Sequence, residues 1–214
     1  MPNALIWGAS GGIGSALVNI LKENDWQVYG VARHDERIPD NADMAIHFDA
    51  NDPFSYDTAI MTIAQSVETV DLVVYAAGGI RANTLEKLDI TDWNAVINAN
   101  LTGAFLAATK SLQLLSKDGH LMLISAHVEN ILFPRMGAYA AAKAGLETMF
   151  TILQKENRKR NLTLVRPPAI DTNFWDNAPF KLPDGALKPE DVANAMLQHY
   201  VAGESGILNM EAAK

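Results

Sequence analysis

The chain has 214 residues, of which 49% are hydrophobic and 20% charged, a balance typical of a soluble globular protein and not of a disordered one. Its formal net charge of −8 argues against a nucleic-acid-binding surface, and the absence of cysteine excludes disulfides and thiolate metal sites. No apolar run is long enough to span a membrane, and the first expected strand begins near residue 3, which leaves no room for a signal peptide. We therefore expect a cytoplasmic protein that binds neither membranes nor metal ions.

Short apolar segments alternate with amphipathic segments along the whole chain. The expected strands occupy residues 3–7, 26–32, 44–48, 70–75, 120–125, 162–166 and 206–210. The expected helices occupy residues 12–23, 53–66, 91–99, 101–115, 137–159 and 189–202. This alternation predicts the α/β class: a single doubly wound Rossmann domain over residues 1–214, whose seven-stranded parallel sheet carries helices on both faces. Ligands of such sheets bind beyond the carboxyl ends of the strands.

A glycine-rich turn separates the first expected strand from the first expected helix. Gly8, Gly12 and Gly14 stand in a G-x-x-x-G-x-G spacing. Glycines let the backbone approach a pyrophosphate, and the free N–H groups and dipole of the helix favour its charge. The turn therefore predicts a dinucleotide site, although glycine turns also arise for purely geometric reasons.

Residues 168–187 form the longest stretch without a regular pattern. The stretch contains several prolines together with apolar side chains such as Phe174, Trp175 and Phe180. A loop this long inside a compact domain is usually functional or mobile. We expect it to be a short lid over the substrate site.

Tyr139 and Lys143 are four residues apart on the expected helix 137–159 and therefore share one helix face. A neighbouring cation lowers the pKa of a phenol because it favours the phenolate. A tyrosine tuned in this way can protonate the alkoxide that forms when a carbonyl accepts hydride. The alternative is a surface tyrosine with a lysine one helical turn further along.

Five motifs in chain order give the sequence its resemblance to the short-chain dehydrogenase/reductase family. The glycine turn of residues 8–14 resembles the family's T-G-x-x-x-G-x-G, and Ala76-Ala77-Gly78 resembles the end of its N-N-A-G. Asn98-Ala99-Asn100-Leu101 is similar to its helical asparagine motif, and Tyr139 with Lys143 matches its Y-x-x-x-K pair. Residues 167–172 resemble its P-G-x-x-x-T segment. The resemblance covers essentially the whole chain.

The resemblance implies catalytic roles for four positions. Tyr139 would be the proton donor in reduction, and Lys143 would bind the nicotinamide ribose and lower the pKa of the phenol. Asn100 would hold a water that links Lys143 to solvent. The family usually has a serine thirteen residues before the tyrosine, where this chain has Ala126. The neighbouring Ser125 is the candidate replacement, although a regular strand would point its side chain the other way, and His127 could serve if its loop turned inward.

The resemblance also implies a set of nicotinamide-dinucleotide contacts. Asp49 would accept the adenine amino group or act only as a turn residue, and Thr172 would contact the carboxamide or phosphates or act only as a helix cap. The full set comprises Gly8, Ser10, Gly12, Ile13, Gly14, Arg33, Asp49, Ala50, Ala76, Ala77, Gly78, Tyr139, Lys143, Pro168, Ile170 and Thr172.

The residue after the second expected strand indicates which dinucleotide is bound. An acidic residue there holds the ribose 2′-hydroxyl of NAD, whereas an arginine accommodates the 2′-phosphate of NADP. This chain has Arg33, followed by His34, while Asp35 and Glu36 come later in the loop. We therefore predict NADP(H); a solvated loop arginine is the alternative.

Further departures from the family pattern bear on the substrate. Trp7 and Tyr75 replace residues that brace two loops, and we expect aromatic packing to brace them here. The Ala126 position and the short lid are similar to dihydropteridine reductases, a branch of the family that reduces a quinonoid dihydropterin. Pocket-lining residues expected from loop positions are Arg81, Asn83, His127, Met136, Phe174 and Trp175.

Two classes of function remain open from the sequence. The favoured one is an NADPH-dependent reductase of a carbonyl-type small molecule, with pterin reduction as the alternative within enzymes. The other is a non-catalytic module that senses NADP(H), which Ala126 favours and the intact Tyr139, Lys143 and Asn100 oppose. The alanine-rich helices 101–115 and 137–153 would also suit a homodimer or homotetramer.

Overall fold

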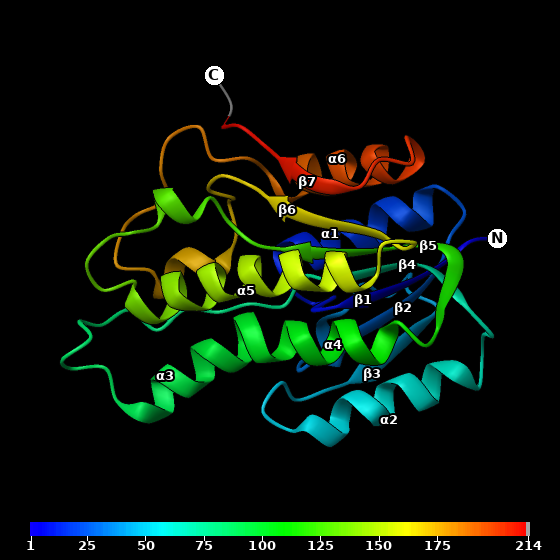
Figure 1. Cartoon of the computed structure of the whole chain (residues 1–214), viewed down its shortest axis with the longest axis horizontal. Helices are drawn as coiled ribbons and strands as arrows, with labels where there is room; N and C mark the ends of the chain where they lie inside the picture. The colour runs from blue at the N-terminus through cyan, green and yellow to red at the C-terminus, as the bar shows by residue number, and fades with distance from the viewer. Residues whose placement is uncertain (213–214) are drawn as a thin grey trace.

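One seven-stranded sheet runs through the protein, whose computed structural model describes residues 1–212 (Figure 1). The strand order is β3-β2-β1-β4-β5-β6-β7, and every neighbouring pair is parallel. The strands are β1 (Asn3–Trp7), β2 (Gln27–Ala32), β3 (Met44–His47), β4 (Val70–Tyr75), β5 (Leu115–Ile124), β6 (Asn161–Arg166) and β7 (Gly206–Asn209). The predicted doubly wound α/β architecture is confirmed.

Helices cover both faces of this sheet. They are α1 (Gly12–Glu23), α2 (Pro53–Ala64), α3 (Ile90–Ile97), α4 (Gly103–Ser111), α5 (Gly137–Glu156) and α6 (Pro189–Val201). The apolar side chains of α1 and α6 pack on one face, and those of α2, α4 and α5 pack on the other. In Figure 1, α4 and α5 cross in front of the strands, and α3 continues α4 toward the left.

The central strand β1 shows why the chain folds this way. Ala4 and Ile6 enter the core beneath α1 and α6, while Leu5 and Trp7 enter the core beneath α2, α4 and α5. All four side chains are fully buried, since a strand between two helical layers has no polar face. Apolar residues at four successive positions therefore specify an interior parallel strand.

The helical region before β5 differs from the prediction. A π-helical turn, Asn98–Thr102, joins α3 and α4, so that residues 90–111 form one nearly continuous helical run instead of two separate helices. The strand that follows begins at Leu115 and not at residue 120, and its pairing with β4 shifts register between Val70 and Leu72. Short 3₁₀ turns at residues 35–37, 128–130 and 173–177 were not predicted.

The sheet topology determines where a ligand would lie. β2 lies on one side of β1 and β4 on the other, so the chain leaves β1 at the point where the strand order reverses. The glycine turn, the loop after β4 and the start of α5 all follow the carboxyl ends of central strands. None of the helices within residues 1–212 combines the length and apolarity that a membrane span requires.

Candidate active site

The glycine turn after β1 is held tightly against two neighbouring strands. The N–H groups of Gly8 and Ala9 donate to the Val31 carbonyl of β2, at 2.7 and 3.1 Å. Gly8 has φ +85°, and a Cβ on it would lie 2.5 Å from the backbone nitrogen of Ala77, in the loop after β4. Both the positive φ and the close backbone approach require glycine at this position.

The same turn leaves donors free at the start of α1. A Cβ on Gly14 would collide with the Gly8 carbonyl, so the helix begins directly against the turn. Gly11 caps α1 without a side-chain hydrogen bond, and in the described chain no acceptor meets the N–H groups of Gly12, Ile13 and Gly14. Three outward N–H groups at a helix N-terminus form a cradle that fits the pyrophosphate of a dinucleotide. Ser10, half-buried, lies within this turn.

The loop after β2 presents Arg33 to solvent. Arg33 is exposed, and no ion pair involving it occurs within residues 1–212. The neighbouring acids have partners, since Asp35 faces His47 at 3.3 Å and Glu36 faces His34 at 3.3 Å. The residue free to meet a ligand at this strand end is therefore cationic.

The loop after β3 holds Asp49 in a local turn. Its Oδ1 accepts from the backbone N–H and the side-chain amide of Asn51, at 2.9 and 3.1 Å, and its carbonyl accepts from Ser55 at 2.7 Å. The turn role that the sequence left open is therefore present, and the adenine role of Asp49 and the adjoining Ala50 stays a prediction.

The loop after β4 is joined to the glycine turn through the backbone. The Ala76 N–H donates to the Trp7 carbonyl at 2.8 Å, and Ala77 lies against Gly8. The exposed Gly78 lies beside Asn100, because a Cβ on it would lie 2.9 Å from the Asn100 Oδ1. The backbone of residues 76–78 therefore connects the glycine turn to the neighbourhood of Asn100.

The expected aromatic bracing has a different form. Trp7 stacks on Tyr56 of α2, with centroids 5.2 Å apart, and donates its indole N–H to Ser111 of α4 at 3.0 Å. Tyr75 donates its hydroxyl to the Ala99 carbonyl at 2.8 Å. The aromatic rings therefore join the sheet to α2 and to the α3–α4 region, because both side chains point into the core beneath those helices instead of along the sheet edge.

Tyr139 and Lys143 lie one helical turn apart near the start of α5. The Lys143 Nζ lies 5.6 Å from the centre of the Tyr139 ring and donates to the Ile124 carbonyl at the end of β5, at 2.8 Å. Lys143 is only 4% exposed, and Tyr139 is half-buried. A buried ammonium at the carboxyl end of a central strand, beside a phenol, is an arrangement suited to proton transfer.

Burial shifts both groups toward their neutral forms. It raises the pKa of the Tyr139 phenol and lowers the pKa of the Lys143 ammonium to about 8. The expectation that Lys143 lowers the pKa of Tyr139 is therefore wrong for the protein alone. The ammonium is directed to the Ile124 carbonyl, and desolvation of the phenolate dominates.

Asn100 lies in the π-helical turn and is 1% exposed. Its Nδ2 donates to the carbonyls of Gly79 and Val96, at 2.7 and 2.9 Å. Its Oδ1 is buried and meets no donor within residues 1–212. A buried acceptor of this kind is a place where an ordered water is expected.

His127 does not take the place of the serine that this chain lacks at position 126. Its Nε2 bonds the carbonyl of Met210, just after β7, at 2.9 Å, and its Nδ1 faces Glu129 at 3.5 Å, so both ring nitrogens have partners. Ala126 is buried and carries no donor, and Ser125 is 3% exposed with an Oγ that meets no partner in the described chain. Ser125 is thus a free hydroxyl next to the expected position.

The segment 168–187 crosses from the end of β6 to α6 and packs on the site. Ile170 pairs with Leu187, which fixes both ends of the segment. Thr172 caps a short 3₁₀ turn by accepting from the Phe174 N–H at 3.3 Å, and its methyl group lies so close to Gly12 that a Cβ there would collide with it. The Phe174 ring lies 5.2 Å from that of Tyr139. Pro168, which starts the segment, is half-buried.

The remaining pocket candidates make mainly local contacts. Arg81 is exposed and faces Asp92 at 3.5 Å, and Asn83 donates to the Lys87 carbonyl at 3.1 Å. Trp175 donates its indole N–H to the Ile170 carbonyl at 2.7 Å, and Met136 is buried at the start of α5. Among the aromatic candidates, Phe174 lies against Tyr139, with ring centroids 5.2 Å apart.

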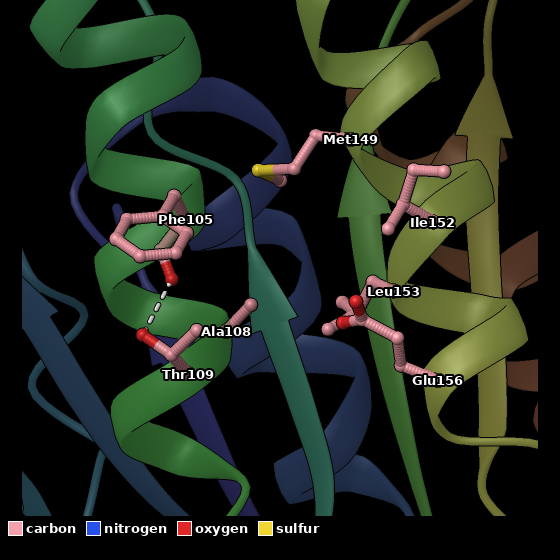
Figure 2. Close-up of a pocket in the computed structure, with 7 residues that line it drawn as sticks. All are labelled: Phe105, Ala108, Thr109, Met149, Ile152, Leu153 and Glu156. Carbon is pink, nitrogen blue, oxygen red and sulfur yellow. Dashed lines mark hydrogen bonds between the residues drawn. The ribbon is translucent and has the colours of Figure 1, made fainter.

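An apolar groove lies away from these residues, on the outer side of α4 and α5. Figure 2 shows Phe105 and Ala108 on α4 and Met149, Ile152 and Leu153 on α5, the two helices that flank the groove. The groove has a volume of about 330 Å³ and is also lined by Thr109 and Glu156. It contains none of the proposed catalytic residues, so it is a surface feature separate from the site.

Sequence reasoning missed the residues that support the site from behind. Tyr56, Gly103 and Ser111 form contacts with Trp7 or Tyr75 across long sequence separations. The one available signal was the presence of two aromatic residues at strand ends where the family has small polar ones. That signal indicated a changed brace without naming its partners.

Comparison with known proteins identifies the family. The model of the short chain dehydrogenase family matches residues 2–181. A 3-oxoacyl-[acyl-carrier-protein] reductase of Synechocystis is 31% identical over 188 residues, which cover 81% of this chain and 76% of the relative. An uncharacterised oxidoreductase of Staphylococcus aureus strain USA300 is 26% identical over 206 residues, 91% of this chain and 88% of the relative.

A solved structure extends the likeness over nearly the full length. The alcohol dehydrogenase of the archaeon Thermococcus sibiricus, complexed with 5-hydroxy-NADP, superimposes with a TM-score of 0.90 at 25% identity. The match covers 99% of this chain and 97% of that protein. The chain belongs to the short-chain dehydrogenase/reductase family and is an oxidoreductase of that family.

Proposed function

We propose that this oxidoreductase uses NADPH to reduce a carbonyl-type small molecule, with Tyr139 as the proton donor. The observation that carries the proposal is the Tyr139–Lys143 pair, whose ammonium is held at the carboxyl end of β5 by the Ile124 carbonyl. This edge of the sheet is where the glycine turn offers its free N–H groups.

The choice of NADPH rests on the loop after β2. Arg33 is exposed and has no acidic partner in the described chain, whereas Asp35 contacts His47 and Glu36 contacts His34. A guanidinium matches a 2′-phosphate through paired, charge-assisted hydrogen bonds, which a carboxylate at that place would repel. The Thermococcus relative, which was crystallised with 5-hydroxy-NADP, supports a dinucleotide of this class.

The protein's own residues would supply the proton and stabilise the groups that exchange it. When bound, the reduced nicotinamide would supply the hydride. Tyr139 is a neutral phenol at pH 7, and burial raises its pKa further, so it has a proton to give to the developing alkoxide. Lys143, charged below about pH 8, would stabilise the resulting phenolate, and Asn100 would hold the water that returns a proton from solvent.

The substrate must react without the usual second hydrogen-bond donor. Ala126 has no hydroxyl, and the His127 Nε2 is engaged with Met210. Loss of one such donor costs roughly 3 to 4 kcal/mol in a site that depends on it. We infer an acceptor that is activated by conjugation or ring strain, or one that uses the Ser125 hydroxyl.

Ala126 also favours a second candidate. A quinonoid dihydropterin accepts hydride into a conjugated C=N system and develops less charge on a single oxygen. The ring centroids of Tyr139 and Phe174 are 5.2 Å apart, and those of Phe174 and Trp175 are 5.6 Å apart. This group of rings would pack against a flat substrate. Quinonoid dihydropterin is therefore included among the acceptors to be tested.

The deciding experiment follows NADPH oxidation against ketones, quinones, β-keto thioesters and quinonoid dihydropterin. We expect turnover on at least one conjugated carbonyl, and activity confined to the pterin would select the second candidate. NADPH binding without turnover on any acceptor would contradict the enzyme proposal and favour a sensing module. Failure to bind NADPH or NADH would overturn both.

The groove of Figure 2 supports a homodimer as part of the proposal. Phe105 is 47% exposed and Ile152 is 48% exposed, although both belong to alanine-rich helices with apolar neighbours. Large apolar side chains gathered on one helical face are typical of subunit packing. Sedimentation should give a dimer or tetramer for the wild type and a monomer for Phe105→Glu. A monomeric wild type at micromolar concentration would contradict the proposal.

A further inference from the structure

The π-helical turn before α4 deprives one carbonyl of its helical donor. The Gly103 N–H donates to the Asn98 carbonyl, one residue further back than in an α-helix. In an α-helix the same N–H would serve the Ala99 carbonyl. The turn thus leaves Ala99 in need of another donor in a buried region.

Tyr75 supplies that donor from the end of β4. Its hydroxyl donates to the Ala99 carbonyl at 2.8 Å, and its side chain is 1% exposed. The bond joins a central strand to the turn and spans 24 positions of sequence. Because water cannot replace a donor at this depth, the hydroxyl offsets the cost of the irregular backbone.

The residue after Ala99 is the candidate relay residue Asn100. Its amide is fixed by the Gly79 and Val96 carbonyls, and its Oδ1 remains free. A return of the turn to regular α-helix would rotate Asn100 about the helix axis and away from the Gly79 carbonyl. The direction of the free Oδ1 therefore depends on the backbone that Tyr75 holds.

Gly103 makes room for this contact. A Cβ on Gly103 would collide with the Tyr75 hydroxyl and lie 2.7 Å from the Tyr56 hydroxyl. The two hydroxyls are therefore neighbours, but they differ in their hydrogen bonds. Tyr75 bonds the Ala99 carbonyl, whereas the buried Tyr56 hydroxyl lies beside the Tyr75 hydroxyl and bonds no backbone carbonyl in the described chain.

We propose that Tyr75 is a positioning residue, whose hydroxyl bond to Ala99 sets the π turn that directs Asn100 into the active site. The proposal rests on the reductase function proposed above. It assigns a role to a residue where this chain departs from the family pattern, and it gives the irregular turn a purpose beyond packing.

The test compares two variants, Tyr75→Phe and Tyr56→Phe, each of which removes one of the two neighbouring hydroxyls. Tyr75→Phe should lower kcat tenfold or more and leave the Kd for NADPH within twofold of wild type. Tyr56→Phe should change neither by more than twofold. Equal kcat values for the two variants would overturn the proposal.

A double variant separates positioning from general loosening. If Tyr75 acts through Asn100, Tyr75→Phe should lower kcat by less than twofold when Asn100→Ala is already present. A full multiplicative loss in the double variant would show that Tyr75 acts by another route. The pH profile of kcat should shift in Tyr75→Phe as in Asn100→Ala, and an unshifted profile would count against the relay.

Amide hydrogen exchange decides the inference even if no acceptor is turned over. An inactive wild type would contradict the proposed function. The exchange rates would still show whether the Tyr75 hydroxyl holds the π turn. Amides of residues 96–104 should exchange at least tenfold faster in Tyr75→Phe than in Tyr56→Phe. Equal protection in the two variants would show that the turn does not depend on the Tyr75 hydroxyl.

Discussion

The Lys143 ammonium donates to the Ile124 carbonyl at 2.8 Å, across the boundary between α5 and β5. This single bond fixes a nearly buried cation beside Tyr139, where burial lowers its pKa to about 8. Burying a charge with one neutral acceptor costs stability that an apolar side chain would not. The proposed reaction gives this buried charge a purpose, because the ammonium would stabilise the phenolate that Tyr139 becomes once it has given up its proton.

Tyr139→Phe should lower kcat by about 10² to 10⁴-fold, because it removes the proposed acid but keeps the ring. The Kd for NADPH should stay within threefold of wild type, since the glycine turn and Arg33 are untouched. Steady-state NADPH oxidation and fluorescence titration measure the two quantities. Tyr200→Phe, on α6, is the matched control and should behave as wild type. Activity above one tenth of wild type in Tyr139→Phe would refute the acid role.

Arg33→Ala should weaken NADPH binding about 10- to 100-fold, the effect of losing charge-assisted hydrogen bonds to a phosphate. NADH binding should change by less than twofold, because NADH lacks the 2′-phosphate. Arg37→Ala provides a control at an exposed arginine that already faces Glu36. A parallel loss for both nucleotides, or an equal effect of Arg37→Ala, would show that Arg33 does not select the cofactor.

The parts of the site that follow local spacing could be predicted from the sequence. The glycine motif spans seven positions, 8–14, and the Tyr139–Lys143 pair spans one helical turn. Parallel topology then places both at the same sheet edge. The alternation of apolar strands and helices predicted the fold for the same reason, because each element's pattern reflects its own burial.

The parts that depend on long-range contacts could not be predicted. The partner of His127 is a carbonyl 83 positions away, so no local pattern could show that its Nε2 is occupied. The sign of the Tyr139 pKa shift depends on how deeply the folded chain buries the phenol. The π turn at Asn98–Thr102 has no composition signal, since its bonds to Tyr75 and Gly79 come from the loop and strand before it.

Stability should fall in mild acid because of His120. This side chain is 2% exposed, bonds Thr163 at 2.7 Å, and lies near His199, itself 3.2 Å from Glu204. Burial, with a smaller contribution from His199, lowers the pKa of His120 from 6.5 to about 4. The unfolded state therefore binds a proton between these values that the folded state does not, and stability is lost as pH drops from about 6.5 to 4.

The loss assigned to His120 is roughly 3 kcal/mol, from a shift of about 2.5 pKa units. Urea unfolding at pH 7 and pH 4.5 captures most of this loss in the wild type and is compared with His120→Asn, which cannot titrate there. The wild type should lose more stability than the variant over this interval. His34→Gln, at a more exposed histidine, should follow the wild type. Equal pH dependence in His120→Asn and wild type would contradict the assignment.

Gly103→Ala should destabilise the protein even though alanine is the better helix former. The propensity gain is about 1 kcal/mol, whereas overpacking a core costs about 1 to 3 kcal/mol. The added Cβ would collide with the Tyr75 hydroxyl and lie 2.7 Å from both the Tyr56 hydroxyl and the Asn98 carbonyl. Because two of these three atoms belong to side chains, the cost should depend on them.

Removing both hydroxyls therefore tests whether they cause the clash. In a Tyr56→Phe, Tyr75→Phe background, Gly103→Ala should cost at least about 1 kcal/mol less than in the wild type, the coupling typical of residues in contact. Gly79→Ala is the control, because a Cβ there meets nothing within 4 Å and should shift stability by less than about 0.5 kcal/mol. Urea unfolding midpoints of the variants give each difference. Additive costs across the cycle would mean that the Asn98 carbonyl alone excludes the methyl group, and that the tyrosine hydroxyls do not shape this turn.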